Sequence, residues 1–172
     1  MKERSSFLQI TNDQKMMKSA KTEDWTYHQV FGTVVVDESI GKYYWQLCTS
    51  ESFYGRLAII DYGNFNRSEY SFEDTLFEHT HVVGCGSANG WYVGTQFGNE
   101  CSALSKFFKS GEDVKIQVSI SDRKVLFENV ISHQTVEISL PTFTRKVKLV
   151  VETIVRSCDC YVTIVESGPW VD

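Results

Sequence analysis

The clearest pattern along the chain is a strict alternation of apolar and polar side chains between residues 111 and 129. The apolar positions fall on one face of a strand: Val114, Ile116, Val118 and Ile120. The polar positions fall on the other face: Lys115, Gln117 and Ser119. A period of two is typical of a strand with one buried face. The Ser-Asp-Arg of residues 121–123 is a turn sequence, and residues 124–127 begin a return strand. The pattern predicts a β-hairpin in an all-β fold.

Similar alternation or β-branched runs recur along the rest of the chain, with turn residues between them. The segments predicted as strands are 30–36, 42–49, 56–61, 81–85, 91–97, 135–140, 147–155 and 160–165. One short helix is predicted over 101–109, because Ser110 and Gly111 would end it. About ten short strands with turns between them predict a two-sheet antiparallel β-sandwich or a barrel, with at most one or two short helices.

The length of 172 residues is that of one domain, which can form a core without a metal or disulfide. We expect a single β-sandwich domain over 25–172, preceded by an N-terminal extension over 1–24. In that extension Leu8 and Ile10 alternate as in an edge strand, and residues 12–22 would form a loop or short helix. The chain has two prolines, so no Pro-rich linker divides it.

The charge balance narrows the range of partners. Seventeen basic and 22 acidic side chains give a net charge of −5, which argues against nucleic acid and anionic membranes as partners. The sequence has no apolar run of the length of a secretory signal or a membrane span. We therefore expect an intracellular, cytoplasmic protein whose cysteines stay reduced.

Two groups of metal-binding residue types occur, but their spacing does not suit zinc. His79 and His81 lie two residues apart with Cys85 nearby, and Cys158 and Cys160 form a second pair. Structural zinc sites typically use cysteine pairs separated by two to four residues, which neither group provides. We predict histidines at loop ends, core thiols, and no metal or other cofactor.

Signatures of catalysis fail once their context is considered. The glycine-rich segment 84–90 lacks the Lys-Ser/Thr pair of a phosphate-binding loop, and the strand-like residues after it offer no helix N-terminus to an anion. A hairpin turn is the better interpretation. No local motif joins a cysteine nucleophile to a histidine base. We predict no catalytic residues and no enzyme activity, and a small hydrolase is the least favoured class.

Three segments, taken in order, resemble the SPRY domain family. Residues 41–45, Gly-Lys-Tyr-Tyr-Trp, resemble the G-x-Y-Y-W-E strand of that family, with Gln46 in place of Glu. Residues 56–61 stand where the family has an iGv or iGi strand, although Ala58 or Ile59 replaces its glycine. The 111–129 hairpin resembles the family's segment from G-D-x-(I/V) to F-x-N-G, with Val130 in place of the final glycine.

The likeness spans about residues 30–165, and Trp91 lies near the place of the family's central tryptophan strand. Ser119 or Ser121 replaces an acidic residue of the family's hairpin. These departures leave two interpretations open, a divergent SPRY-like sandwich or another concanavalin-like sandwich. The resemblance implies a bent antiparallel sandwich whose end loops bind peptides or folded protein surfaces. It also implies a non-catalytic adaptor that recruits substrates, with the ligand left unidentified.

Aromatic and amide side chains gather in two predicted loops. Loops on a rigid scaffold commonly carry binding residues, and aromatic side chains are frequent interface anchors. We predict a shallow patch that binds a protein or short peptide, made by the 62–72 loop and the 86–90 turn. Its residues are Tyr62, Asn64, Phe65, Asn66, Tyr70, Ser87, Asn89 and Trp91. The structural alternative is that Phe72, and with it Tyr62, fills the end of the sandwich as part of its core.

A glycan is the alternative ligand. Asn64, Asn66 and Asn89 could hydrogen-bond a sugar ring that stacks on a neighbouring aromatic side chain. This hypothesis would make the chain a carbohydrate-binding, lectin-like module.

Overall fold

The fold comes from a computed structural model, which describes residues 8–11, 16–19, 27–66, 75, 80–88, 93–154 and 160–172. Within these residues the chain forms thirteen strands and one short 3₁₀-helix, η3 (Ser102–Leu104). The strands are β1 (Leu8–Thr11), β2 (Met16–Ser19), β3 (Tyr27–Phe31), β4 (Lys42–Thr49), β5 (Gly55–Asp61), β6 (Val82–Gly86), β7 (Gly94–Gln96), β8 (Asn99–Cys101), β9 (Asp113–Ser119), β10 (Lys124–Asn129), β11 (Thr135–Ser139), β12 (Val147–Ile154) and β13 (Cys160–Pro169).

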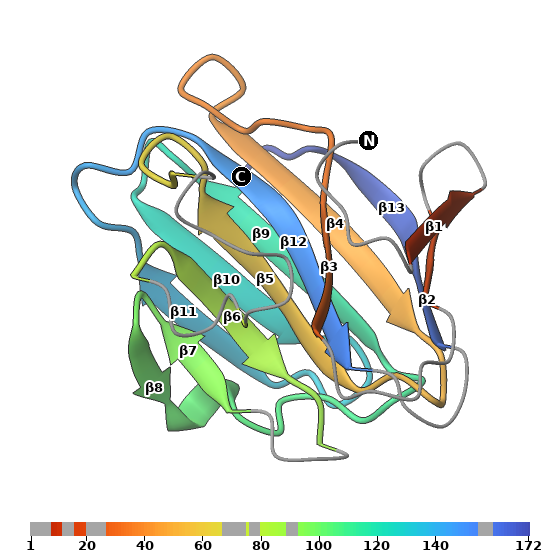
Figure 1. Cartoon of the computed structure of the whole chain (residues 1–172). Helices are drawn as coiled ribbons and strands as arrows, with labels where there is room; N and C mark the ends of the chain where they lie inside the picture. The colour runs from red at the N-terminus through yellow and green to blue at the C-terminus, as the bar shows by residue number, and fades with distance from the viewer. Residues whose placement is uncertain are drawn as a thin grey trace.

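The strands form two antiparallel sheets packed face to face (Figure 1). The seven-stranded sheet has the order β1-β2-β13-β4-β9-β10-β11, and the six-stranded sheet has the order β3-β12-β5-β6-β7-β8. Neither sheet closes into a barrel. The predicted all-β sandwich is therefore confirmed. Strands β12 and β13, from the end of the chain, lie inside the two sheets beside strands from its beginning.

The hairpin predicted from the alternation is formed by β9 and β10, which pair from Ser119 and Lys124 to Val114 and Asn129. The apolar face of β9 is fully buried in the core, whereas Lys115 and Gln117 lie on the outer face of the sheet. The alternating residues therefore belong to the structural scaffold of the sandwich.

The core lies between the two sheets. Trp45 and Leu47 of β4 enter it from the seven-stranded sheet, and Leu57 and Ile59 of β5 enter it from the six-stranded sheet. Complete burial of a side chain of this kind stabilises a fold by about 1.5–3 kcal/mol. The core thus gives the loops at the two ends of the sandwich a rigid frame.

The outer face of the six-stranded sheet is also covered. A second apolar cluster lies there, and Phe65 packs against it. Its buried members are Phe31, Ala58, Ile60, Val82 and Val150. Because Phe65 follows β5 closely, the chain after this strand turns back over the outer face of its own sheet.

A buried polar cluster shares this outer face, since β12 pairs Glu152 with Gln29 of β3 and Arg56 of β5. The buried Glu152 carboxylate accepts hydrogen bonds from Gln29 (2.7 Å), Thr75 (2.9 Å) and Arg56 (3.1 Å). A carboxylate removed from water needs such partners. Thr75 belongs to the long connection between β5 and β6, so the cluster attaches that residue to the sheet.

The helix predicted over 101–109 is mostly wrong, because only η3 is helical. Leu104, Phe107 and Phe108 have helical spacing and are all buried. Their backbone, however, pairs with the end of β6: the Phe107 N–H donates to the Gly86 carbonyl (2.9 Å), and the Ala88 N–H donates to the Phe108 carbonyl (2.6 Å). Tertiary hydrogen bonds here outweigh local helix propensity.

The N-terminal segments also differ from the prediction. Part of the segment predicted as loop or helix forms β2, which pairs with both β1 and β13. β1 forms the edge of the seven-stranded sheet. The strand predicted over 30–36 occurs earlier, as β3, and after Gly32 only Val36 bridges to Val147. Pairing with β12 therefore decides where this strand begins and ends.

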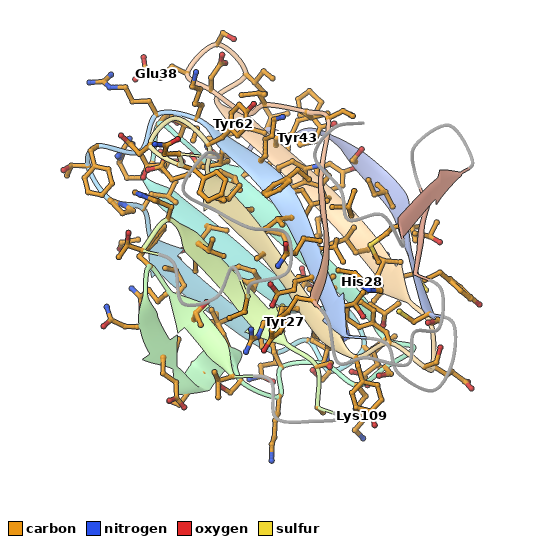
Figure 2. All side chains as sticks on the ribbon, viewed as in Figure 1. Tyr27, His28, Glu38, Tyr43, Tyr62 and Lys109 are labelled. Atoms are coloured by element: carbon orange, nitrogen blue, oxygen red, sulfur yellow. The ribbon has the colours of Figure 1, made fainter. Side chains whose placement is uncertain are left out.

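The connecting loops gather at two opposite ends of the sandwich (Figure 1). The upper end comprises turn 37–41, loop 62–66, turn 120–123, loop 141–146 and residues 170–172. The lower end comprises residues 50–54, 87–88, 102–112 and 130–134. Figure 2 places Glu38 and Tyr62 towards the upper end and Lys109 at the lower end. In the part of the chain that the structure describes, no helix is long and apolar enough to cross a membrane.

Candidate partner-binding surface

Asp61, the last residue of β5, organises the upper end. Its carboxylate is 1% exposed and accepts hydrogen bonds from the Asn64 amide (2.9 Å) and the Thr144 hydroxyl (2.8 Å). The Asn64 backbone N–H adds a third at 3.3 Å, and the Phe65 N–H donates to the Asp61 carbonyl. A buried carboxylate is costly without such partners, so Asp61 holds loops 62–66 and 141–146 together.

Tyr62 is half-buried at the upper end (Figure 2). The ammonium group of Lys148 lies 4.0 Å from the centre of its ring, and the Tyr62 N–H donates to the Lys146 carbonyl (3.0 Å). A cation–π contact of a partly desolvated lysine contributes about 1–2 kcal/mol. The contact with Lys148 thus holds the ring in place, with part of the Tyr62 side chain exposed.

The other predicted residues of this loop differ in their contacts within the chain. Phe65 is turned onto the sheet, with its ring centre 6.1 Å from that of Phe31. The Asn64 amide is engaged by Asp61 and by the Phe143 carbonyl (3.3 Å). Asn66 is exposed. Within loop 62–66, Tyr62 and Asn66 are therefore better placed than Phe65 to contact a ligand.

Neighbouring segments add exposed apolar side chains that the sequence did not single out. Phe143 of loop 141–146 is 57% exposed, and Ile40 of turn 37–41 is 39% exposed. An ion pair between Arg145 and Glu38 (2.9 Å) joins the two segments. Exposed apolar side chains on an ordered backbone have the properties of interface anchors.

Further hydrogen bonds order these loops. The Arg123 guanidinium donates to the Thr144 carbonyl (2.6 Å) and to the Pro141 carbonyl. The Asp37 carboxylate accepts from the backbone N–H groups of Ser39 (2.9 Å) and Ile40 (3.3 Å), and its bond with the Ser39 hydroxyl lowers its pKa. Because internal bonds already order the loops, the loops lose less conformational entropy when a partner binds.

The C-terminal residues form one side of the upper end. The Trp170 indole N–H donates to the Val118 carbonyl (3.3 Å), and the Lys42 ammonium lies 4.8 Å from the centre of the Trp170 ring. Lys42 also pairs with Asp172 and with Asp122 (3.0 Å). These carboxylates raise the pKa of Lys42, and Lys42 lowers the pKa of Asp122. Lys42, at the start of β4, thus joins the C-terminal Asp172 to Asp122 of turn 120–123 through two ion pairs.

The upper end does not include Ser87. β5 pairs antiparallel with β6, with Arg56 opposite Gly86 and Ile60 opposite Val82. Tyr62 and Ser87 therefore lie at opposite ends of a seven-residue strand, roughly 20 Å apart at the usual rise per residue. Ser87 is buried, and its hydroxyl accepts a hydrogen bond from the Gly55 N–H (3.2 Å), which is a structural role. Tyr70, Phe72, Asn89 and Trp91 lie outside the described residues.

Two solved SPRY domains match nearly the whole fold. The SPRY domain of human HERC1 matches 94% of this chain and 93% of its own length, with a TM-score of 0.69 and 9% sequence identity. The PSpry domain of TRIM65 matches 95% of this chain and 86% of its own length, with a TM-score of 0.69 and 14% identity. The fold is SPRY-like. The predicted resemblance is therefore confirmed at the level of structure.

The SPRY-like fold also occurs as part of a larger chain. The stonustoxin structure matches 94% of this chain but only 26% of its own length, with a TM-score of 0.62 and 11% identity. By sequence alone, no family model and no curated protein matches. The likeness at these identities shows the fold and leaves function to be argued from the surface.

Two thiols of this SPRY-like sandwich, those of Cys48 and Cys85, are poorly suited to nucleophilic chemistry. Burial raises the pKa of Cys85, and burial together with the nearby Asp113 raises the pKa of Cys48. Both side chains are thus held as thiols, whereas the thiolate is the nucleophile. Among the described residues, no three His, Cys, Asp or Glu side chains come together as a metal-binding group. His79 and Cys158 of the zinc hypothesis lie outside those residues.

The signals for Phe143 and Ile40 were present in the sequence but weak. Phe143 stands in Pro-Thr-Phe-Thr, between two strands, and Ile40 stands in Asp-Glu-Ser-Ile-Gly, a turn sequence. A large apolar side chain among turn residues is a possible exposed anchor. Only the structure shows whether such a side chain is exposed or packed against the core, because loop packing decides which way it points.

Proposed function

We propose that this chain is a non-catalytic binding module whose upper end captures a protein or a short peptide, as an adaptor that recruits a substrate does. The observation that carries the proposal is the exposure of Phe143, on a loop ordered by Asp61 and Arg123, and of Ile40, on a turn ordered by Asp37. The SPRY-like fold supports the class of function, and the thiols of Cys48, Cys85 and Cys101 suit a reducing, cytoplasmic setting.

The surface suits an extended segment with apolar side chains. Phe143 and Ile40 would contact those side chains, and the half-buried Tyr62 and the exposed Asn66 would lie beside the bound segment. The Arg145–Glu38 pair is exposed and contributes little to stability, so either partner can exchange it for a charged ligand group. A shallow patch with few anchors predicts a dissociation constant of about 1–100 μM.

A random peptide library displayed on phage tests this proposal. Peptides selected on the wild-type protein should bind Phe143→Ala and Tyr62→Ala at least about ten-fold more weakly, since loss of an aromatic anchor costs about 1.4 kcal/mol or more. The matched control is Ile131→Ala, because Ile131 is equally exposed but lies at the lower end. Affinities are measured by fluorescence anisotropy, after unfolding midpoints show that each variant is folded.

Two results would overturn the proposal. One is that the selected peptides bind Phe143→Ala and Tyr62→Ala as tightly as the wild type. The other is that Ile131→Ala weakens them instead. A glycan array provides the comparison with the lectin-like hypothesis. Asn64 already bonds to Asp61 and Phe143, which weakens that hypothesis, but glycan binding that needs Asn66 would replace peptide capture.

A further inference from the structure

The seven-stranded sheet ends in an open edge. Among the described residues, β11 pairs only with β10, and it is the last strand of the sheet order. Thr135, Glu137 and Ser139 are all exposed, and none of the described strands pairs with the far side of β11. The strand has no proline between its ends, and its pairing with β10 is regular from Lys124 to Glu128. Edges of this kind are templates for pairing with another strand.

The hydrogen-bond pattern shows which backbone groups face outward. The Leu140 N–H donates to the Arg123 carbonyl (2.8 Å), and the Asn129 N–H donates to the Gln134 carbonyl (2.9 Å). In an antiparallel ladder, hydrogen-bonded pairs recur at every second residue. The even-numbered residues 134–140 therefore direct their backbone groups to β10. The N–H and C=O groups of Thr135, Glu137 and Ser139 point to the open edge.

We propose that this edge binds an extended peptide, which adds to β11 as an eighth strand of the sheet. The three outward residues provide three donors and three acceptors at the spacing of a strand, which is the recognition chemistry of β-strand addition. The site lies on the flank of the sandwich and shares no residue with the upper-end anchors Phe143 and Ile40. It is a second interaction surface, independent of the proposed one.

The side chains of β11 define the sequence that such a peptide needs. The Glu137 carboxylate is exposed and only loosely paired with Lys124 (3.4 Å). A Lys or Arg opposite Glu137 would add a favourable cross-strand pair. On the inner side, the half-buried Val136 and the buried Ile138 border the edge. The peptide should therefore alternate, with polar residues including a central cation on one face and apolar residues on the other.

A second copy of this chain fits the edge less well. A two-fold pairing that uses all three outward residues is centred on Glu137, because Thr135 must then face Ser139 of the other copy. This register sets two Glu137 carboxylates directly opposite each other, which is destabilising. Other registers of the same pairing leave outward groups of β11 unpaired. Charge complementarity thus favours a foreign peptide with a basic residue.

Proline at position 137 tests the backbone contact specifically. Glu137→Pro removes an N–H that β10 does not use, so the sheet should remain intact. Random ten-residue peptides on phage are selected on the wild type and counter-selected on Glu137→Pro. We expect survivors that bind the wild type at least about ten-fold more tightly than Glu137→Pro. Glu137→Gln keeps the backbone donor and should cost at most about five-fold, the value of one cross-strand pair.

Amide exchange provides the second readout and does not depend on the folding of the proline variant. In the free protein the amides of Thr135, Glu137 and Ser139 should exchange faster than those of Val136 and Ile138, and a bound peptide should slow the first three. An absence of survivors, equal binding to Glu137→Pro, or protection confined to the upper end would overturn the proposal. A wild-type dimer in sedimentation that Glu137→Pro abolishes would identify a second copy as the occupant.

Discussion

At the scale of single residues, the upper end depends on one buried carboxylate. Asp61 accepts hydrogen bonds from Asn64 and Thr144, and these residues belong to two loops that carry the proposed anchors. Tyr62 directly follows Asp61, and Phe143 directly precedes Thr144. The positions of the Tyr62 and Phe143 rings are therefore set by Asp61, which is buried and would not contact a ligand.

Asp61→Ala should destabilise the protein by about 2 kcal/mol or more, because it leaves the buried Thr144 hydroxyl without its acceptor and removes the hydrogen bond to Asn64. Urea unfolding measures the change. Asp37→Ala is the matched control, since that carboxylate also caps a turn of the upper end but is exposed to water, and it should cost less. Equal losses in the two variants would refute a special role for Asp61.

The roles of single residues were harder to predict from the sequence than the strands were. Aromatic and amide side chains among turn residues indicated loop 62–66 as a surface segment, and Tyr62 and Asn66 are partly or fully exposed there. The same signal placed Ser87 beside them. The length of β5 and its antiparallel register with β6 instead separate Ser87 from Tyr62. Long-range pairing of this kind leaves no local trace in the sequence.

At the scale of elements, strands with one buried face were predicted well. β4, β9 and β10 alternate between core and solvent, and the 42–49 strand has the predicted bounds. The predicted helix failed because Phe107 and Phe108 reach the core through backbone pairing with β6. β3 was misplaced because its register with β12 decides its length. Period-two patterns are local, whereas the partners of a strand are not.

β3 also supplies a test of how strand docking depends on pH. His28 of β3 is buried opposite Thr153 of β12, and burial lowers its pKa. In the unfolded chain a histidine has a pKa of about 6.5, so the unfolded state takes up the proton first as the pH falls. Stability should therefore be constant at higher pH and decrease as the pH falls below that value, until the folded-state pKa is reached.

Urea unfolding of the wild type and of His28→Gln between pH 8 and pH 5.5 measures this dependence. The wild type should lose more stability across the range than His28→Gln does. His133→Asn is the control, because His133 is exposed and asparagine tolerates its positive φ of 61°. The same pH dependence in the wild type and His28→Gln would show that the buried histidine does not titrate as expected.

At the scale of the whole molecule, a SPRY-like sandwich persists at 9–14% identity to two solved SPRY domains. A shared fold does not define the ligand, so function is argued from the surfaces of this chain. The hydrogen-bonded loops of the upper end and the open edge of β11 are two separate surfaces of this sandwich. Partner capture at the upper end is the central claim, because it combines the fold, the exposed anchors and the ordered loops.

The most direct test is a map of amide exchange in the complex with the tightest peptide from the random library, compared with the free protein. We expect new protection in turn 37–41, loop 62–66 and loop 141–146, with residues 102–112 and 130–134 of the lower end unchanged. Protection at the lower end without any at these three segments would rule out partner capture at the upper end.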